Sequence, residues 1–158
     1  MIIIMGSSGD EEFTKPICIT LKKLGLPYEL RVSSAHKTPY GLLKMLEEYE
    51  SSMDRIVYIT VAGRSNALSG FVDANTKYPV IACPPQSEKF GGADIYSSLR
   101  MPSGVSPLVV LEPENAAFAA AKILALANSE LCETVLDYQQ DVKNKTVLDD
   151  EKVRKTKD

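Results

Sequence analysis

The sequence predicts an α/β fold, a three-layer αβα sandwich built on a parallel, flavodoxin-like or Rossmann-like sheet. Two observations predict it. Short apolar segments alternate with longer amphipathic segments along the 158 residues, and such alternation is typical of parallel strands joined by right-handed helical crossovers. The first apolar segment, residues 2–5, is apolar at every position, as expected for a strand buried on both faces of a sheet.

Each expected strand is a short apolar run, and each is followed by turn residues or by a helical pattern. The strands are expected at residues 2–5, 28–32, 55–61, 79–83 and 108–111. The helices are expected at residues 10–24, from 39 to beyond 49, in a short stretch ending at 75, at about 95–99, and at 114–128 and 130–143.

Two prolines bear on the helix ends. Pro16 has no N–H to donate, so it is expected either to kink the first helix or to move its start to about Thr14. Pro39 suits the first position of the second helix, with Thr38 before it as the N-cap.

The second half of the chain contains a long connection and a charged end. Residues 84–107 are rich in glycine, proline and serine, and a connection of this length in a small domain is expected to be functional or to pack against a partner. Residues 149–158 are expected to form a solvated tail. Because neither a repeat nor a second domain is evident, residues 1–158 are interpreted as a single domain.

Composition excludes several classes of protein. A net charge of −3 without a basic stripe argues against nucleic-acid binding. Polar residues 6–10 follow the apolar start at once, so neither a signal-peptide core nor a membrane span is expected. Three widely spaced cysteines and a single histidine indicate a reducing compartment and disfavour a disulfide framework or a transition-metal site. Hard-cation binding by carboxylates stays open, although no motif points to it.

The predicted sheet brings three polar loops together. In the common doubly wound order, strand 1 lies between strands 2 and 3, so the loops after these strands meet at the carboxyl edge. These loops are residues 6–10, 33–38 and 62–66.

The first loop, Gly6-Ser7-Ser8-Gly9-Asp10, has small residues that let an anion approach the backbone ahead of a helix. The alternative is an ordinary turn with Asp10 as the N-cap. The loop lacks the residue spacing of a dinucleotide-binding fingerprint, of a P-loop and of a nucleophile elbow.

The second loop contains His36, the only histidine, and an imidazole in such a loop is a candidate proton shuttle. Ser34 and Lys37 flank it, and the third loop adds Arg64 and Ser65. Each loop could be a plain solvated turn, but together they would form an anion clamp beside one general acid/base.

Two nucleophilic alternatives remain open. A hydrolase triad is disfavoured because no carboxylate is evidently placed to orient His36. A Cys83–His36 pair is the other alternative, although Cys83 precedes two prolines at a strand end, where a buried structural thiol is favoured.

The motifs in combination resemble a known family. Residues 5–10 (Met-Gly-Ser-Ser-Gly-Asp), 34–39 (Ser-Ala-His-Lys-Thr-Pro), 62–66 (Ala-Gly-Arg-Ser-Asn), 78–81 (Tyr-Pro-Val-Ile) and 101–105 (Met-Pro-Ser-Gly-Val) occur in the order and at the intervals of phosphoribosylaminoimidazole carboxylases of purine biosynthesis. The resemblance runs from Ile2 to about Asn128. One departure is Gly9, which stands where the family usually has a serine.

The family has two branches. One isomerises a carbamate, 5-(carboxyamino)imidazole ribonucleotide, and typically has an arginine at the position of Lys37 and a second histidine in the third loop. This chain has Lys37 and no histidine in its third loop, so it resembles the branch that uses carbon dioxide directly. The mutase reaction is the alternative within the family, and a non-catalytic nucleotide-phosphate binding domain is the alternative outside it.

The resemblance implies reversible carboxylation of 5-aminoimidazole ribonucleotide by carbon dioxide, giving the 4-carboxy product without biotin, ATP or metal. It implies that His36 is the general acid/base at carbon 4. It also implies substrate-binding roles for residues of all three loops. In the first two loops Gly6 is a substrate-binding residue, Ser7, Ser8 and Lys37 hold the phosphate, Asp10 accepts from the ribose, and Ser34 and Ala35 hold the carboxylate. In the third loop Ala62 and Gly63 form a close-packed wall, and Arg64 and Ser65 help to place carbon dioxide or carboxylate.

The resemblance further implies a cytoplasmic homo-octamer that acts on a small molecule, with neither nucleic acid nor membrane as partner. The alanines at residues 116–121 could allow close helix packing between subunits, or they could simply favour a helix.

Overall fold

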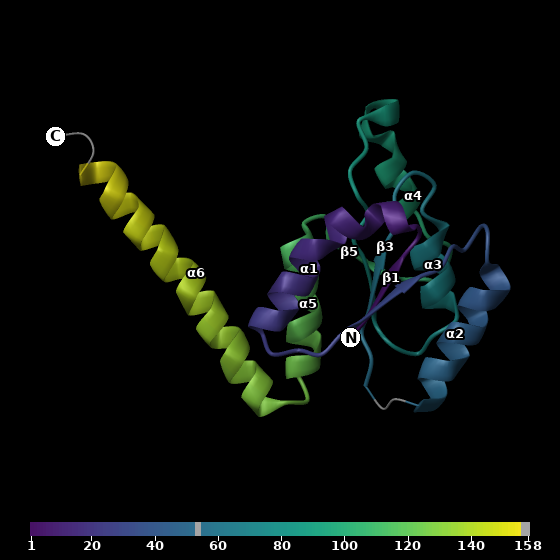
Figure 1. Cartoon of the computed structure of the whole chain (residues 1–158), viewed down its shortest axis with the longest axis horizontal. Helices are drawn as coiled ribbons and strands as arrows, with labels where there is room; N and C mark the ends of the chain where they lie inside the picture. Colours follow the sequence, from purple (N-terminus) through teal and green to yellow (C-terminus); the bar gives the residue numbers. More distant parts are fainter. Residues whose placement is uncertain (53–54, 156–158) are drawn as a thin grey trace.

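The structure is a computed structural model that describes residues 1–52 and 55–155. The strands described there are all parallel and form one sheet in the order β2-β1-β3-β4-β5 (Figure 1). Their bounds are β1 Ile2–Met5, β2 Glu29–Val32, β3 Tyr58–Val61, β4 Val80–Ala82 and β5 Leu108–Val109. The order confirms that strand 1 lies between strands 2 and 3, so the loops that follow them share one edge of the sheet.

Helices cover both faces of this sheet (Figure 1), which confirms the three-layer prediction. The longer helices are α1 Glu11–Lys23, α2 Pro39–Ser52, α3 Ala67–Ala74, α5 Pro113–Ala125 and α6 Ser129–Lys155. Three shorter ones are the 3-10 helices η1 Ser8–Asp10 and η2 Lys89–Ile95 and the single turn α4 Tyr96–Leu99. Among the described residues, no helix is both long enough and apolar enough to cross a membrane.

Strand β1 explains the uninterrupted apolar run at the start of the chain. Ile3 and Met5 pack into the core beneath α1 and α5, with Ile17 as a partner. Ile2 and Ile4 point to the opposite face and pack with residues of α2 and α3. Because successive side chains alternate between two buried faces, every position of the strand is apolar.

Four strands are shorter than predicted, β2 by one residue because it begins at Glu29 rather than residue 28. β3 begins at Tyr58 rather than residue 55, β4 covers only Val80–Ala82, and β5 ends at Val109 rather than 111. Ile56 and Val57 are nevertheless buried, and the carbonyl of Val57 accepts a hydrogen bond from Ile2 N–H at 3.2 Å. Hydrophobic burial therefore extends beyond the paired residues, and an apolar run alone overestimates strand length.

Helix α1 begins at Glu11, so Pro16 does not move the helix start to Thr14 and that alternative was wrong. Pro16 lies in the second turn, where its missing N–H removes one backbone bond. The Thr14 hydroxyl donates to the Asp10 carbonyl at 2.8 Å, and two acidic residues in the first turn suit the positive end of the helix. These interactions favour a start before the proline.

Helix α6 corrects the prediction for the C-terminal region. It continues to Lys155 rather than ending at residue 143, and the predicted solvated tail is helical from 149 to 155; residues 156–158 lie outside the described part. The segment contains neither glycine nor proline, and the pairs Lys152–Asp149 and Arg154–Asp150 join successive turns at 3.6 and 3.8 Å. The solvated character is confirmed, since residues 149–155 are exposed.

Candidate active site

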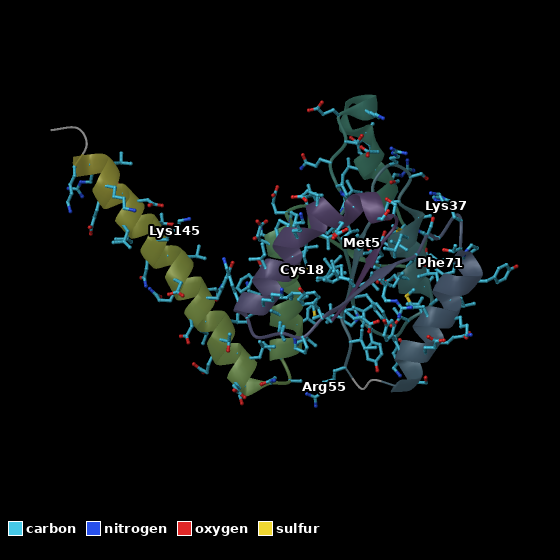
Figure 2. All side chains as sticks on the ribbon, in the orientation of Figure 1. Met5, Cys18, Lys37, Arg55, Phe71 and Lys145 are labelled. Atoms are coloured by element: carbon cyan, nitrogen blue, oxygen red, sulfur yellow. The ribbon has the colours of Figure 1, made fainter. Side chains whose placement is uncertain are left out.

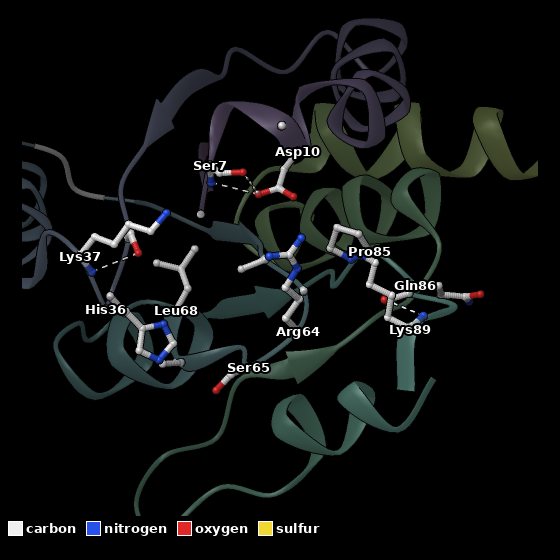
Figure 3. A pocket seen from close by; sticks show the side chains of 18 residues that line it. Ser7, Asp10, His36, Lys37, Arg64, Ser65, Leu68, Pro85, Gln86 and Lys89 are labelled. Atoms are coloured by element: carbon white, nitrogen blue, oxygen red, sulfur yellow. Dashed lines mark hydrogen bonds between the residues drawn. The ribbon is translucent and has the colours of Figure 1, made fainter. Parts of the chain in front are cut away.

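A cavity of about 560 Å³ lies at the carboxyl edge of the sheet, where the three predicted loops meet. Figure 3 shows the first loop at the top, the second at the left and Arg64 in the centre. Ser8 is the one predicted site residue that is not part of the lining. The predicted residues that do line the cavity are Gly6, Ser7, Asp10, Ser34, Ala35, His36, Lys37, Ala62, Gly63, Arg64 and Ser65.

The first loop is organised by Asp10. Its Oδ2 accepts a hydrogen bond from the Ser7 N–H at 3.0 Å and another from the Ser7 hydroxyl at 3.2 Å. This is a capping box on η1, with Asp10 as its third residue. Asp10 also occupies the predicted N-cap position of α1, but its side chain makes no capping hydrogen bond to that helix. The amides of Ser8 and Gly9 open this helix, where backbone N–H groups lack intrahelical acceptors.

Two glycines of the first loop differ in their need for a small residue. A Cβ on Gly6 would lie 3.1 Å from the Cβ of Ala62, so a glycine lets the first and third loops approach closely. A Cβ on Gly9 would meet only Ser7 Oγ, at 3.4 Å. The backbone therefore does not require glycine at position 9, and a serine would fit there.

The second loop is held by Ser34 and Thr38. Ser34 N–H donates to Thr38 Oγ1 at 3.0 Å, and Thr38 N–H donates to the Ser34 carbonyl at 2.8 Å. The Thr38 hydroxyl therefore hydrogen-bonds Ser33 and Ser34 of the second loop. Pro39 takes the first position of α2, as predicted. Ser34 Oγ accepts from Lys37 N–H at 3.3 Å, which leaves its hydroxyl proton to donate to a ligand.

His36 lines this cavity and is exposed. Within residues 1–52 and 55–155, no carboxylate hydrogen-bonds or pairs with its imidazole. A Ser-His-Asp type of triad requires such an orienting carboxylate. The arrangement therefore suits a histidine that exchanges a proton directly with a bound molecule.

The third loop contains a left-handed residue. Arg64 has φ +60°, a backbone conformation that residues other than glycine rarely adopt. Its neighbour Gly63 is close to another loop, since a Cβ there would lie 3.1 Å from the Pro85 carbonyl oxygen. Small residues at positions 62 and 63 thus allow close packing of the cavity wall.

A fourth segment completes the cavity, and the sequence motifs did not identify it. Pro85, Gln86 and Lys89 lie on the right-hand side of Figure 3. The same segment adds Ser87 to the lining, and Ala67 and Leu68 of α3 also line the cavity. The one available signal is the length of the connection from residue 84 to 107, which predicts either a functional segment or one that packs against a partner. Nothing in its composition distinguished which of its residues would reach the site.

The charges around the cavity favour an anionic ligand. Lys37, Arg64 and Lys89 contribute positive charge, whereas Asp10 is the one carboxylate among the lining residues that the structure describes. Cationic side chains with backbone N–H groups are the usual partners of phosphate and carboxylate groups. Among the described residues, no three histidine, cysteine or acidic side chains gather as a metal site.

Cys83 lies outside this cavity and does not pair with His36. It is fully buried, and its thiol donates to the Leu111 carbonyl at 3.7 Å. Burial, reinforced by the negative charges of Glu112 and Glu114, raises the pKa of the Cys83 thiol to about 12. A thiol in this state is a poor nucleophile, which supports the structural interpretation.

Comparison with known proteins identifies the family to which these loops belong. The family model for AIR carboxylase matches residues 1–145. The chain belongs to the AIR carboxylase family. This is an enzyme family of purine biosynthesis, so a purely non-catalytic nucleotide-binding domain does not describe the chain.

Individual relatives agree. Phosphoribosylaminoimidazole carboxylase of Archaeoglobus fulgidus is 53% identical over 97% of this chain and 84% of its own length. The Treponema denticola enzyme of the same name is 51% identical over 98% of both chains. The Drosophila melanogaster bifunctional carboxylase/succinocarboxamide synthetase is 47% identical over 81% of this chain and 30% of its own. The crystal structure of Treponema denticola PurE superposes with a TM-score of 0.91 at 53% identity, covering 96% of each chain.

Proposed function

We propose that the protein carboxylates 5-aminoimidazole ribonucleotide at carbon 4, reversibly and with carbon dioxide as the direct co-substrate. The observation that supports this most is the position of His36, which lies in the family's second motif and lines the same cavity as three cationic side chains. A ribonucleotide brings a phosphate to such a site, and the product adds a carboxylate. Both anions suit the charge of the lining.

The reaction needs one proton to be moved. The ring amine makes carbon 4 nucleophilic, so carbon 4 attacks the carbon of carbon dioxide and one carbon–oxygen π pair moves to oxygen. The adduct still carries hydrogen at carbon 4, and the ring regains aromaticity when His36 accepts that proton. In the reverse direction the protonated His36 returns the proton to carbon 4, and the carbon–carbon bond breaks to release carbon dioxide.

The loops supply the binding contacts. Lys37 and the backbone amides of the first loop bind the phosphate. The second oxygen of Asp10 accepts from a ribose hydroxyl, since Oδ2 is used by Ser7. The free hydroxyl proton of Ser34 and the Ala35 N–H bind the new carboxylate beside His36, while Arg64 and Ser65 face it from the third loop. Ser8 is left out of these contacts because its side chain does not line the cavity.

No biotin, ATP or metal takes part in the proposed reaction. Carbon 4 is already nucleophilic and carbon dioxide already electrophilic, so neither partner needs activation by a carrier. Turnover is therefore expected to persist in EDTA and without nucleotide triphosphate.

Direct use of carbon dioxide, rather than mutase chemistry, is supported by two features. The third loop has Arg64, Ser65 and Asn66 and lacks a histidine, and Lys37 replaces the arginine of the mutase branch. The relatives named above are carboxylases, including the bifunctional animal protein.

The experiment that tests the function starts from purified protein, 5-aminoimidazole ribonucleotide and bicarbonate, without ATP. Formation of the 4-carboxylate, with a lag shortened by carbonic anhydrase, is the expected result. The carbamate is expected to react only through its spontaneous breakdown. If labelled carboxylate passes from the carbamate to the product without mixing with a trapped pool of carbon dioxide, the protein is a mutase and the proposal is wrong.

We further propose that the protein works as a homo-octamer in the cytoplasm. Helix α6 supports assembly: Leu131 and Val135 are buried against the body, and Val142 and Val153 continue the same helical face but are 53% and 59% exposed. Figures 1 and 2 show this half of α6, marked by Lys145, projecting away from the sheet. A second copy of the chain is the occupant expected on such a face.

Four alanines of α5 are used within the chain rather than offered to a second subunit. Ala116, Ala117, Ala120 and Ala121 are fully buried within the protomer, and three of them pack in the core that contains Ile17 and Leu21 of α1. Their small size instead allows α5 to lie close to α1 within one chain.

All three cysteines are free, which is consistent with a reducing cytoplasm.

A further inference from the structure

The third loop is joined to a segment about thirty residues later in the chain. Arg64 N–H donates to Asp94 Oδ2 at 3.2 Å. The Ser97 hydroxyl lies 2.9 Å from the Arg64 carbonyl oxygen and 2.7 Å from the Asp94 carbonyl oxygen, so these two acceptors share its one proton. The next bonds involve Asn66: its N–H donates to Ser97 Oγ at 2.9 Å, and its side-chain amide donates to Ser98 Oγ at 3.0 Å. Four hydrogen bonds therefore connect the loop to the end of η2 and to α4.

These bonds surround a residue in an unfavourable conformation. Among the described residues other than glycine, Arg64 alone has a positive φ, +60°. An arginine at such a position is retained against the local preference only when its surroundings hold it there. Here the Asp94 carboxylate accepts from the N–H of Arg64, and the Ser97 hydroxyl, which also contacts the Asp94 carbonyl, lies within hydrogen-bond distance of the Arg64 carbonyl. Both backbone polar groups of Arg64 are therefore contacted by the distant segment.

The backbone conformation of Arg64 decides where its side chain goes. Because the Cα–Cβ direction follows from φ and ψ, a change to a right-handed conformation would swing the guanidinium to another side of the loop. In the present conformation the Arg64 side chain lies centrally in the cavity, between Asp10 above and Ser65 below (Figure 3). Asp94 and Ser97 themselves do not line this cavity.

The hydrogen bond between Asn66 and Ser98 is buried and strengthens the attachment of the third loop to α4. Asn66 and Ser98 are 3% and 1% exposed, and their side-chain bond is therefore shielded from water. Asn66 Oδ1 also accepts from Ser69 N–H at 3.3 Å and so caps α3. Because the loop is attached to α3 by this cap and to α4 by the bond to Ser98, the backbone of Arg64 has little freedom to leave its left-handed conformation.

We propose that Asp94 and Ser97 are positioning residues: they hold Arg64 in its left-handed conformation so that its guanidinium faces the carboxylate that is added or removed at carbon 4. The inference rests on the proposed function, and it deepens it by naming what orients Arg64. It also gives the long connection from residue 84 to 107 a task at the site.

The test compares matched variants in the decarboxylation direction, with the 4-carboxylate as substrate. Ser97→Ala and Asp94→Ala are expected to raise KM for the carboxylate about tenfold, because a displaced binding group loses its contact. The affinity for 5-aminoimidazole ribonucleotide, which lacks the carboxylate, is expected to change less than about twofold. Asp94→Asn keeps an acceptor for Arg64 N–H, and it is expected to restore most of the affinity.

Two controls separate positioning from general damage. Ser103→Ala removes an exposed hydroxyl from the same connection, and Glu88→Ala removes an exposed carboxylate just before η2; both are expected to behave like the wild type. In an Arg64→Ala background, Ser97→Ala is expected to change KM less than about twofold, because the positioned group is gone. Thermal unfolding of every variant verifies that it is folded.

The outcomes are distinguishable. If Ser97→Ala and Asp94→Ala raise KM as much in the Arg64→Ala background as in the wild type, the two residues do not act through Arg64 and the inference is wrong. Equal losses for the carboxylate and for 5-aminoimidazole ribonucleotide would also overturn it. If the wild type has no carboxylase activity at all, the proposed function fails; calorimetric binding of the two nucleotides to the same variants then still tests the positioning role.

Discussion

Asp10 and Ser7 are joined through a single carboxylate oxygen: Oδ2 of Asp10 accepts from both the N–H and the hydroxyl of Ser7, at 3.0 and 3.2 Å. The carboxylate thereby fixes the first loop ahead of η1 and keeps Oδ1 for a ligand. One side chain thus has a structural task and a binding task, and the two can be separated by substitution.

Asp10→Asn and Asp10→Ala are expected to differ. The amide retains an acceptor for Ser7, so the loop stays formed, and KM for the ribonucleotide rises by less than about tenfold through loss of the charge-assisted bond to ribose. The alanine removes the cap as well, so the free energy of unfolding falls by about 1 kcal/mol and KM rises further. Steady-state kinetics and denaturant unfolding measure the two effects. Glu11→Ala is the neighbouring control, and equal behaviour of all three variants would refute a role for Asp10.

His36→Asn is expected to lower kcat by about 10²–10⁴-fold, because it removes the group that takes the proton from carbon 4. Calorimetry with 5-aminoimidazole ribonucleotide is expected to show affinity close to that of the wild type, since the phosphate contacts remain. Turnover near the wild-type rate would remove His36 from the mechanism. Lost binding in a folded variant would mean that His36 serves recognition instead.

Lys37→Ala is expected to weaken binding of the ribonucleotide by about tenfold or more and to leave binding of the free nucleoside unchanged, because only the ribonucleotide carries the phosphate. Lys44→Ala, an exposed lysine of α2 outside the cavity lining, controls for the loss of one positive charge. Equal losses for the two ligands would place Lys37 away from the phosphate.

The fold was largely predictable because the three central strands, β1, β3 and β4, are buried at every position and therefore predominantly apolar in sequence. Residues 2–5 are apolar throughout since both faces of β1 are covered, and the strand order followed from the alternation of strands and helices. The end of α6 was missed for a physical reason. A charged, exposed sequence without glycine or proline is compatible with both a helix and a solvated tail, and the i,i+3 and i,i+4 ion pairs of residues 149–154 are weak signals.

The site was predictable where chemistry and topology coincide. Gly6, His36 and Arg64 follow three strands whose carboxyl ends meet, so their convergence follows from the sheet order. Lys89 and Gln86 reach the cavity from a connection whose path depends on long-range contacts, such as the close approach of Gly63 to the Pro85 carbonyl. The attachment of Arg64 to Asp94 and Ser97 joins residues thirty and thirty-three positions apart, and no local pattern indicates it.

Cys83 gives a prediction about pH. The pKa of the buried thiol is raised to about 12 from an ordinary value of 9.0, first by burial. Above pH 9 the unfolded chain therefore loses a proton that the folded chain keeps, and the free energy of unfolding falls as the pH rises, by up to ~1.4 kcal/mol per pH unit. Below pH 9 this contribution is fully present.

Denaturant unfolding between pH 8 and 11 measures this slope. Cys83→Ala is expected to be less stable at neutral pH, by about 1 kcal/mol for the lost packing, and to have a shallower decline above pH 9. Part of the decline remains, because burial also raises the pKa of Tyr58. Cys132→Ala, at an exposed position, is expected to keep the wild-type slope. An unchanged slope in Cys83→Ala would show that Cys83 is not the titrating group.

Helix α6 gives the last prediction, on assembly. Val142 and Val153 continue the face that Leu131 and Val135 bury against the body, yet both remain exposed in the single chain. The double substitution Val142→Lys with Val153→Lys introduces two charges that a packed interface would have to desolvate. Sedimentation is expected to show an octamer for the wild type and smaller species for the variant, with unchanged helix content by circular dichroism. Asn144→Lys adds a charge to the opposite helical face and is expected to leave the octamer intact. A wild-type mass for the double variant would exclude this face from the interface, and a monomeric wild type would refute the octamer itself.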